Sequence, residues 1–462
     1  MATVVRSHTQ NLTAGPTESA RQPWDLMLVS TAIYMLTNVA RLHQLFPPLA
    51  VLKPIVVFAV LGTIIYFLDK RPMRSWRMIK QDPIVKLVTF IVIWATIGAP
   101  FGIYITQSAF FLYDTVYTAG ILFLLTAASV RTFHDVRRLF YVYGGGLVLV
   151  TIIAMVQKPG SRRLGVAMYD SNDFGMLLVS AIPIAIYALA RARRGVQKAA
   201  AGLGLVILAT ATVQTNSRGA FLALVAVVIY TLFFLKGVKP ALRVATAVGV
   251  IAFLTVAATG TYWERMRTIF VPADDYNRSS MTGRIEIWKR GMGYMFALPV
   301  FGVGVDNFAS AEGRSEFILA RQEQGHGTKW SVAHSSFVQA GAEMGIPGFV
   351  AVIGLYVVAL VHLRRLAKLT KLPNAPSQIK EGAAMGAALM GVMIGLGVAG
   401  AFVTQAFGAA VYASLGLVVG LLKVMRGFGI DTRRRVGPRT RGRVRPMPAA
   451  HVLEAGLNPP AG

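Results

Sequence analysis

Long apolar stretches separated by short polar segments run through most of the chain. A helix of roughly 20 mainly apolar residues spans a bilayer. The pattern therefore predicts an all-α integral membrane protein with about twelve transmembrane helices. The twelve stretches lie near residues 24–40, 49–67, 84–104, 108–130, 139–156, 174–190, 199–214, 219–235, 244–259, 346–362, 383–402 and 407–424.

One polar interruption is much longer than the others and separates the ninth stretch from the tenth. We expect it to form a large loop that carries short helices. The predicted regions are a disordered tail at 1–23, nine transmembrane helices at 24–259, the large loop at 260–345, three transmembrane helices at 346–424 and a basic tail at 425–462.

The basic residues between the stretches indicate an orientation. Alternate connections, together with both chain ends, hold 32 of the 47 Lys and Arg residues. Short cytoplasmic loops collect such residues, so both termini are predicted to be cytoplasmic and the large loop external. The basic, Pro-rich segment 425–462 is interpreted as a solvated tail beside anionic lipid headgroups, in preference to a nucleic-acid-binding segment.

Composition narrows the possible chemistry. Hydrophobic residues make up 55% of the 462 residues and charged residues 15%, whereas soluble domains average about 25% charged residues. The absence of cysteine excludes disulfides and thiolate metal sites, and the seven His residues lack the spacing of a structural zinc site. Residues 1–22 show no signal-peptide pattern, so the first apolar stretch is expected to remain as an anchor.

Three polar clusters fall on the predicted external side. They are "SRRLGVAMYDSNDFG" at 161–175, "QTNSRGAF" at 214–221, and the large loop with "SSMTGRIEIWKRG" at 279–291 and "VAHSSFVQAGAEMGIPG" at 332–348. The cytoplasmic side offers no GxxxxGK[ST] phosphate-binding motif. An enzyme with this arrangement needs an energised substrate that arrives in the membrane, such as a lipid-linked one.

Two arginines occupy predicted helix starts. Arg218 follows Asn216 and Ser217, either of which can cap the helix, and Arg284 follows the expected N-cap Thr282. A cation at this position opposes the helix dipole by about 0.3–1 kcal/mol. An anion held by both the arginine and the free N–H groups makes this arrangement favourable. Phosphate fits that role because a guanidinium donates two parallel hydrogen bonds to it. The alternative is an arginine that extends to lipid headgroups.

Other polar residues of the external clusters are candidates for binding or catalysis. His334 precedes a helical segment and fits a general base, or else a structural histidine. Asp173 fits a helix cap, whereas Asp170 and Asn172 could line a sugar site, and capping and ligand binding stay open as alternatives. Arg163 belongs to the same cluster and is a candidate for binding phosphate or sugar.

Several of these motifs together resemble a known family. "TGRIEIW", "LPVFGVGVDNF" at 298–308 and "HSSFVQAGAEMGIPGF" at 334–349 are similar to the signature of the O-antigen ligase and O-antigen polymerase family, which includes bacterial O-oligosaccharyltransferases. "TNSRGAFLAL" and "YDSNDFGMLL" fall where that family has its other marked segments. The resemblance implies a multi-pass glycosyltransferase of the bacterial inner membrane that acts in surface polysaccharide or lipopolysaccharide biosynthesis, with its active site facing the periplasm.

The resemblance also implies roles for the site residues. Arg218 and Arg284 would engage the diphosphate of an undecaprenyl-diphosphate-linked glycan donor, and His334 would take the proton of the acceptor hydroxyl as it attacks the anomeric carbon with inversion. No metal or other cofactor is required if two guanidinium groups supply the charge stabilisation. Ser217, Thr282 and Ser335 are further candidates for substrate binding, although the family often has Asn where Ser335 stands.

Two functional hypotheses compete. The first is a glycan transferase whose acceptor is a glycan, lipid A core or protein, with ligase, polymerase and oligosaccharyltransferase all open. The second is a transporter or flippase of lipid-linked saccharides. Transport should place charges inside the spans along a central path, and the clearest ones, Lys53 and Asp114, lie near predicted ends or in polar stretches. This contrast favours the enzyme.

Overall fold

The computed structural model describes residues 23–157, 163–271, 280, 282–325, 330–371 and 375–433. Within these ranges the regular structure is helical, and the β-pairing is one isolated bridge between Val166 and Tyr169. The first half of the chain forms α1 (Leu26–Met35), α2 (Pro47–Val51), α3 (Pro54–Leu68), α4 (Trp76–Ile79), α5 (Pro83–Gly98), α6 (Ile105–Phe111), α7 (Tyr117–Ser129) and α8 (Phe133–Gln157).

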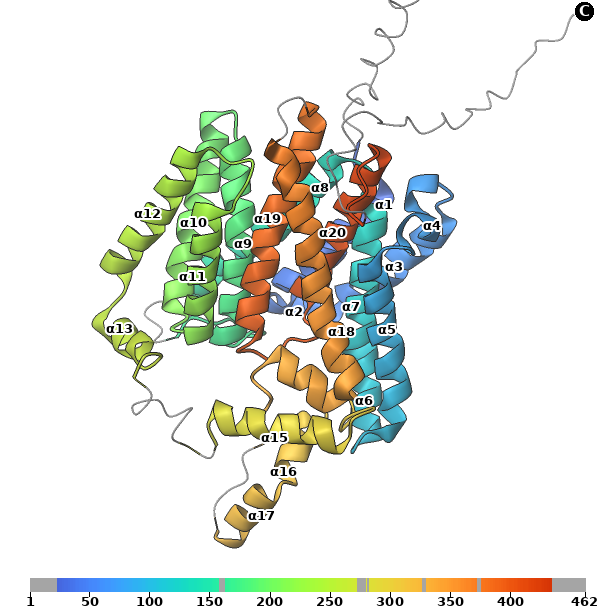
Figure 1. Ribbon diagram of the computed structural model, residues 1–462, viewed down its shortest axis with the longest axis vertical. Coiled ribbons are helices and arrows are strands. Elements are labelled where there is room, and N and C mark those ends of the chain that lie inside the picture. The colour runs from blue at the N-terminus through green and yellow to red at the C-terminus, as the bar shows by residue number, and fades with distance from the viewer. Residues whose placement is uncertain are drawn as a thin grey trace, which may run out of the picture.

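The second half begins with α9 and returns to the bundle after a group of short helices. Its elements are α9 (Ser171–Arg191), α10 (Gly195–Gln214), α11 (Arg218–Phe233), α12 (Pro240–Ala257), α13 (Gly260–Arg267), α15 (Arg284–Ala297), α16 (Phe308–Gly313), α17 (Glu316–Glu323), α18 (Ser336–Ala367), α19 (Ser377–Gly400) and α20 (Ala409–Gly427). The long helices stand side by side, and α13, α15, α16 and α17 lie at one end of the bundle (Figure 1).

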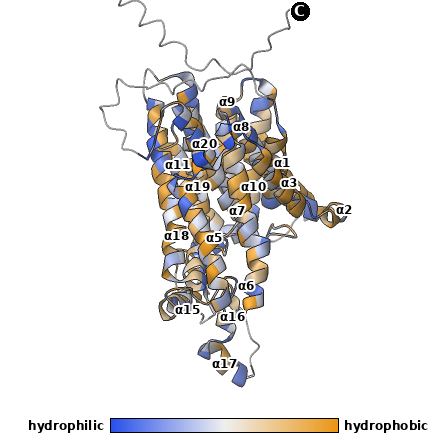
Figure 2. Ribbon diagram, turned by 90° about the vertical axis from the view of Figure 1, so that its right-hand side faces the viewer, coloured by the Kyte–Doolittle hydropathy of each residue, from blue (hydrophilic) through white to orange (hydrophobic). Residues whose placement is uncertain are grey.

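Each of the twelve predicted stretches contains helix, but their lengths differ. Among the described residues, eight helices are long and apolar enough to cross a membrane. The other four stretches form apolar helices of 10–17 residues: Leu26–Ala40, Pro54–Leu68, Arg218–Phe233 and Pro240–Ala252. The prediction of an all-helical multi-pass protein is therefore confirmed for the described residues, whereas the number of twelve spans stays a prediction. Hydrophobic residues predominate along the middle of the bundle, and α17 carries hydrophilic ones (Figure 2).

The centre of the bundle is built around α19 and α20. In their most apolar segments, 78% and 89% of the residues are buried. Small residues along α19 allow neighbouring helices to approach closely. A Cβ at Gly391 would lie 3.0 Å from the Pro183 ring of α9, and one at Gly395 would lie 3.2 Å from side chains of α9 and α11. This packing brings the starts of α9 and α11 to the same end of the molecule.

The predicted large loop contains α13, α15, α16, α17 and the first turns of α18. The α18 helix bends at Gly345, where φ is +69°, so the part that belongs to the bundle begins where the tenth apolar stretch was predicted. A Cβ at Gly345 would lie 2.4 Å from the Pro299 carbonyl oxygen, which requires glycine there. The side chain of Arg290 in α15 binds Glu312 of α16 at 2.6 Å and holds these two helices together.

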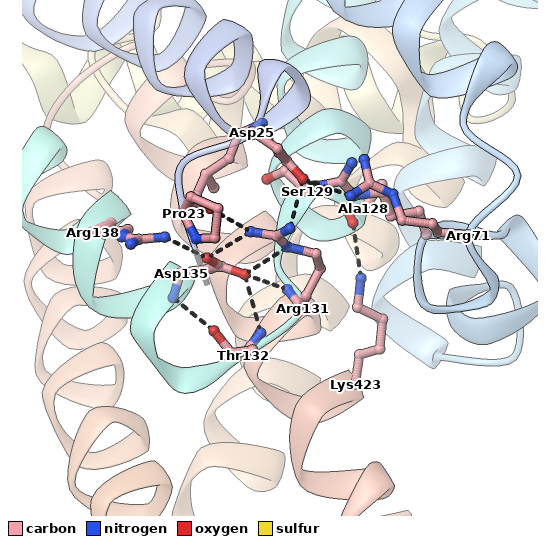
Figure 3. A network of polar contacts seen from close by, with 12 residues as sticks. Pro23, Asp25, Arg71, Ala128, Ser129, Arg131, Thr132, Asp135, Arg138 and Lys423 are labelled. Carbon is pink, nitrogen blue, oxygen red and sulfur yellow. Dashed lines mark hydrogen bonds and ion pairs between the residues drawn. The ribbon is translucent and has the colours of Figure 1, made fainter. Parts of the chain in front are cut away.

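The opposite end of the bundle holds a network of ion pairs, shown in Figure 3. Asp25 Oδ2 accepts from Arg71 at 2.9 Å, from Arg131 at 2.7 Å and from Arg74 at 2.5 Å. The Arg74 side chain is fully buried and also binds Asp69. We call this group the Asp25 network; its members are Asp25, Asp69, Asp135, Arg71, Arg74, Arg131 and Arg138.

Candidate active site

The start of α11 places Arg218 at the first helical position, as predicted. Ser217 is the N-cap, and its Oγ accepts a hydrogen bond from the Ala220 N–H at 3.3 Å. Asn216 precedes the cap with a left-handed φ of +51°. The guanidinium of Arg218 donates to Thr268 Oγ1 at 2.7 Å, just after α13. This bond connects the start of α11 to the first helix of the large loop.

The start of α15 differs from the prediction in one respect. Arg284 is the first helical residue, but the N-cap is Gly283, so the expectation that Thr282 caps the helix is wrong. The helix begins one residue later because Gly283 takes the extended conformation of a cap, and Thr282 Oγ1 instead pairs with Ser280 Oγ at 2.9 Å. No side chain caps this helix. Its first N–H groups therefore lack the usual side-chain acceptor.

The loop 401–408, between α19 and α20, touches both arginine-bearing helix starts. Arg284 Nη1 donates to the Phe402 carbonyl oxygen at 3.2 Å. A Cβ at Gly219, in the first turn of α11, would lie 2.8 Å from Phe402 Cβ. The Phe402 ring also lies 6.1 Å from the Trp288 ring of α15. Phe402 thus joins the two helix starts that sequence alone could only place on the same side of the membrane.

The same loop holds His334. The His334 N–H donates to Thr404 Oγ1 at 2.8 Å, and its φ of +48° is left-handed. This conformation is uncommon for residues other than glycine and concentrates at functional sites. Ser335 is buried and caps α18 by accepting from the Val338 N–H at 3.4 Å. This position indicates a structural role for Ser335. Its role as a substrate ligand stays a prediction.

The start of α9 adds the third predicted cluster. Asp170, and not Asp173, is the N-cap, with Oδ1 accepting from the N–H groups of Asn172 at 2.7 Å and Asp173 at 2.8 Å. Arg163 donates to Asn172 Oδ1 at 3.1 Å. A Cβ at Gly175 would lie 2.6 Å from the methyl group of Ala220. The starts of α9 and α11 are therefore in direct contact.

The charges at these helix starts act on one another. Burial lowers the pKa of Arg284, the charge of Arg218 lowers it further, and Asp170 acts in the opposite direction. Partial burial and then Arg163 and Arg218 lower the pKa of Arg265 in α13. We call this group the Arg284 cluster: Arg163, Arg218, Arg265 and Arg284 around Asp170. Among the described residues no carboxylate forms an ion pair with Arg284.

The structure thus brings most of the predicted site residues together. Three segments distant in sequence supply the Arg284 cluster, and His334 is joined to Arg284 through residues 402–404. Sequence reasoning missed Arg265 and the loop 401–408. Arg265 could have been considered, because it lies in the predicted large loop that also holds Arg284 and His334. The loop gave no signal, since "AFVTQAFG" continues the apolar pattern on both sides.

This arrangement suits a phosphorylated ligand. Guanidinium groups donate paired hydrogen bonds to phosphate oxygens, and uncapped helix N-termini favour anions. Within the described part of the chain, no group of three or more His, Asp or Glu residues is arranged to hold a metal ion.

Comparison with known proteins finds a family similar to part of the chain. The family model described as O-antigen ligase matches residues 203–353, a segment that contains both predicted arginines and His334. No curated protein matches the chain. The family implies a glycosyltransferase-type membrane enzyme that uses a lipid-linked glycan donor and a glycan acceptor, in agreement with the apolar helices. Residues 203–353 are therefore similar to the O-antigen ligase family, which confirms the resemblance that the motifs predicted.

Proposed function

We propose that the protein transfers or polymerises a saccharide from an undecaprenyl-diphosphate-linked donor to an acceptor hydroxyl on the periplasmic face of the inner membrane. The observation that carries this proposal is the Arg284 cluster, in which Arg218 and Arg284 stand at the starts of α11 and α15 and the charges of Arg163, Arg265 and Asp170 act on Arg284. Guanidinium groups this close together favour a bound anion, and a diphosphate is an anion that several of them can hold at once.

Arg218 and Arg284 bind the diphosphate in this scheme. Arg284 is held by the Phe402 carbonyl oxygen and Arg218 by Thr268, so both guanidinium groups are positioned before the donor arrives. Preorganised donors of this kind stabilise charge that develops in the transition state. Arg163 and Asn172 lie at the neighbouring helix start, where they contact the donor sugar or its phosphates.

His334 acts at the acceptor. The acceptor oxygen forms a bond to the anomeric carbon while the bond from that carbon to the diphosphate oxygen breaks, with inversion. The hydroxyl proton passes to the His334 imidazole, and the electron pair leaves with the lipid diphosphate, whose charge the two arginines stabilise. The left-handed backbone at His334 and its bond to Thr404 fix the direction of the side chain near the segment that holds Arg284.

A transfer assay tests this function directly. Purified protein receives a lipid-diphosphate-linked oligosaccharide and candidate glycan, lipid A core or protein acceptors, and release of lipid diphosphate is measured. We expect turnover to fall about 10²–10³-fold in Arg284→Ala and in Arg218→Ala and about 10²–10⁴-fold in His334→Ala. The matched control is Arg267→Ala, an exposed arginine at the end of α13, which should keep full turnover.

Two outcomes would contradict the proposal. Full turnover in all three site variants would exclude the mechanism. Movement of the lipid-linked saccharide across a vesicle membrane, with no glycan transfer to any acceptor, would favour the transporter hypothesis. The acceptor that supports turnover distinguishes a ligase, a polymerase and an oligosaccharyltransferase.

A further inference from the structure

A cavity lies at the far end of α9 from the Arg284 cluster. It has a volume of about 1420 Å³ and opens between α8, α9 and α10, with the start of α19 and the end of α20 closing one side. Pockets for small molecules commonly measure about 300–1,000 Å³, so this cavity suits a larger ligand. None of the residues of the Arg284 cluster lines it.

The inner part of the cavity is an apolar groove along α8. Gly144, Gly145, Val148, Leu149 and Ile152 form one wall, and residues of α10 such as Leu208 form the other. A Cβ at Gly145 would meet no atom within 4 Å. Glycine therefore widens the groove at the point where a larger side chain would project into it.

The mouth of the cavity is basic. Arg137 Nη2 and Arg191 Nε share the single carboxylate of Glu381, at 2.7 Å and 3.0 Å. The buried Arg137 Nε makes no hydrogen bond in the structure. The lining also includes the exposed Arg193, as well as Arg131, whose guanidinium is already bound in the Asp25 network (Figure 3). Glu381 is thus outnumbered by the guanidinium groups around it.

We propose that this cavity binds one anionic membrane phospholipid, with the headgroup phosphate at the arginines of the mouth and the acyl chains along the groove of α8. An amphiphile matches both halves of the cavity, since the charge is confined to the mouth and the interior is apolar. Each basic residue near an anionic lipid headgroup contributes about 1 kcal/mol. The site does not depend on glycan transfer, so its test is independent of the proposed function.

Native mass spectrometry of the full-length protein in detergent tests the headgroup contacts. With phosphatidylglycerol or phosphatidylcholine added in turn, we expect the wild-type protein to retain one phosphatidylglycerol more tightly than phosphatidylcholine. Arg193→Gln should weaken retention of phosphatidylglycerol about fivefold. Lys198→Gln, in the first turn of α10 and outside the lining, is the matched control and should bind as wild type does. Equal retention of the two lipids would overturn the proposal.

A second pair of variants tests the groove. Gly145→Leu should fill the groove and abolish retention of phosphatidylglycerol while the protein stays folded, because leucine is a better helix former than glycine. Gly249→Leu in α12, where a Cβ would also meet nothing within 4 Å, is the matched control. Wild-type retention in Gly145→Leu would overturn the placement of the acyl chains. Displacement of the lipid by inorganic phosphate alone would likewise show that only the anion is recognised.

Discussion

The two ends of the bundle use arginine in opposite ways. In the Asp25 network each guanidinium meets a carboxylate, and Asp25 alone accepts from three arginines. In the Arg284 cluster the charges of Arg218, Arg163 and Arg265 act on Arg284, and Asp170, which opposes them, is the N-cap of α9. One end pairs its arginines with three aspartates, whereas the other brings several arginines close together at the candidate site.

This difference separates structural arginines from those that bind ligand. A buried ion pair holds elements together, and removing one partner leaves a charge without compensation. A cluster of like charges destabilises the protein on its own and persists where a ligand supplies the counter-charge. The network therefore fastens the start of α1 to the segment after α3 and to the connection between α7 and α8. The cluster is suited to binding an anion. The predictions that follow test this distinction, first through stability and then through backbone strain and pH.

The largest expected effect is on stability. Arg74 is fully buried and binds both Asp25 and Asp69, so Arg74→Ala should lower the free energy of unfolding by about 3–5 kcal/mol. Arg284→Ala loses one hydrogen bond and relieves repulsion from Arg218. It should change the free energy of unfolding by less than about 1 kcal/mol. Unfolding of the detergent-solubilised protein, followed by circular dichroism, measures both.

Arg77→Ala is the control for Arg74, because Arg77 is exposed and lies three residues away. It should unfold as the wild-type protein does. A destabilisation of Arg284→Ala equal to that of Arg74→Ala would show that the cluster holds the fold together, and the comparison between the two ends would fail.

A smaller effect is expected from the backbone at His334. A left-handed conformation costs a residue with a side chain about 1–2 kcal/mol, and glycine avoids most of this cost. His334→Gly should therefore be more stable than His334→Ala by about 1 kcal/mol, after allowance for the extra freedom of glycine in the unfolded chain. Both variants should lack turnover. Equal stability of the two variants in the same unfolding assay would show that the backbone at His334 is not strained.

The sequence predicted the helices well because apolar length is a local property. Every apolar stretch contains helix, and Arg218 and Arg284 stand at helix starts as expected. The cap of α15 was misplaced, since Thr282 and Gly283 are both acceptable caps and only the packed structure selects one. The number of spans could not be settled either, because α1, α3 and α11 are shorter than a full span.

The meeting of the site residues could not be predicted from local pattern. Phe402 and Thr404 join Arg284 to His334 across 118 and 70 residues of sequence. Their segment is mostly apolar and adjoins two predicted spans. It contacts the site residues through the Phe402 carbonyl oxygen and the Thr404 hydroxyl. Tertiary packing of α18, α19 and α20 creates that contact, and the hydrophobic periodicity of the sequence does not predict it.

The smallest expected effect distinguishes the two ends by pH. Hydrogen bonds from Arg71, and then from Arg74, hold the pKa of Asp69 well below its usual range, against the effect of burial. A carboxyl with a depressed folded pKa contributes stability that is present above its usual pKa near 4 and is lost as the pH falls toward the folded value. Wild-type stability should therefore decline below about pH 4. Asp69→Asn should be less stable at neutral pH and show a shallower decline. Arg284→Ala should keep the wild-type decline, because a guanidinium stays charged throughout this range.

Unfolding measured from pH 7 down to pH 3 gives the three curves. A decline in Asp69→Asn as steep as in the wild type would show that other carboxylates dominate, and would break the link between the Asp25 network and acid stability.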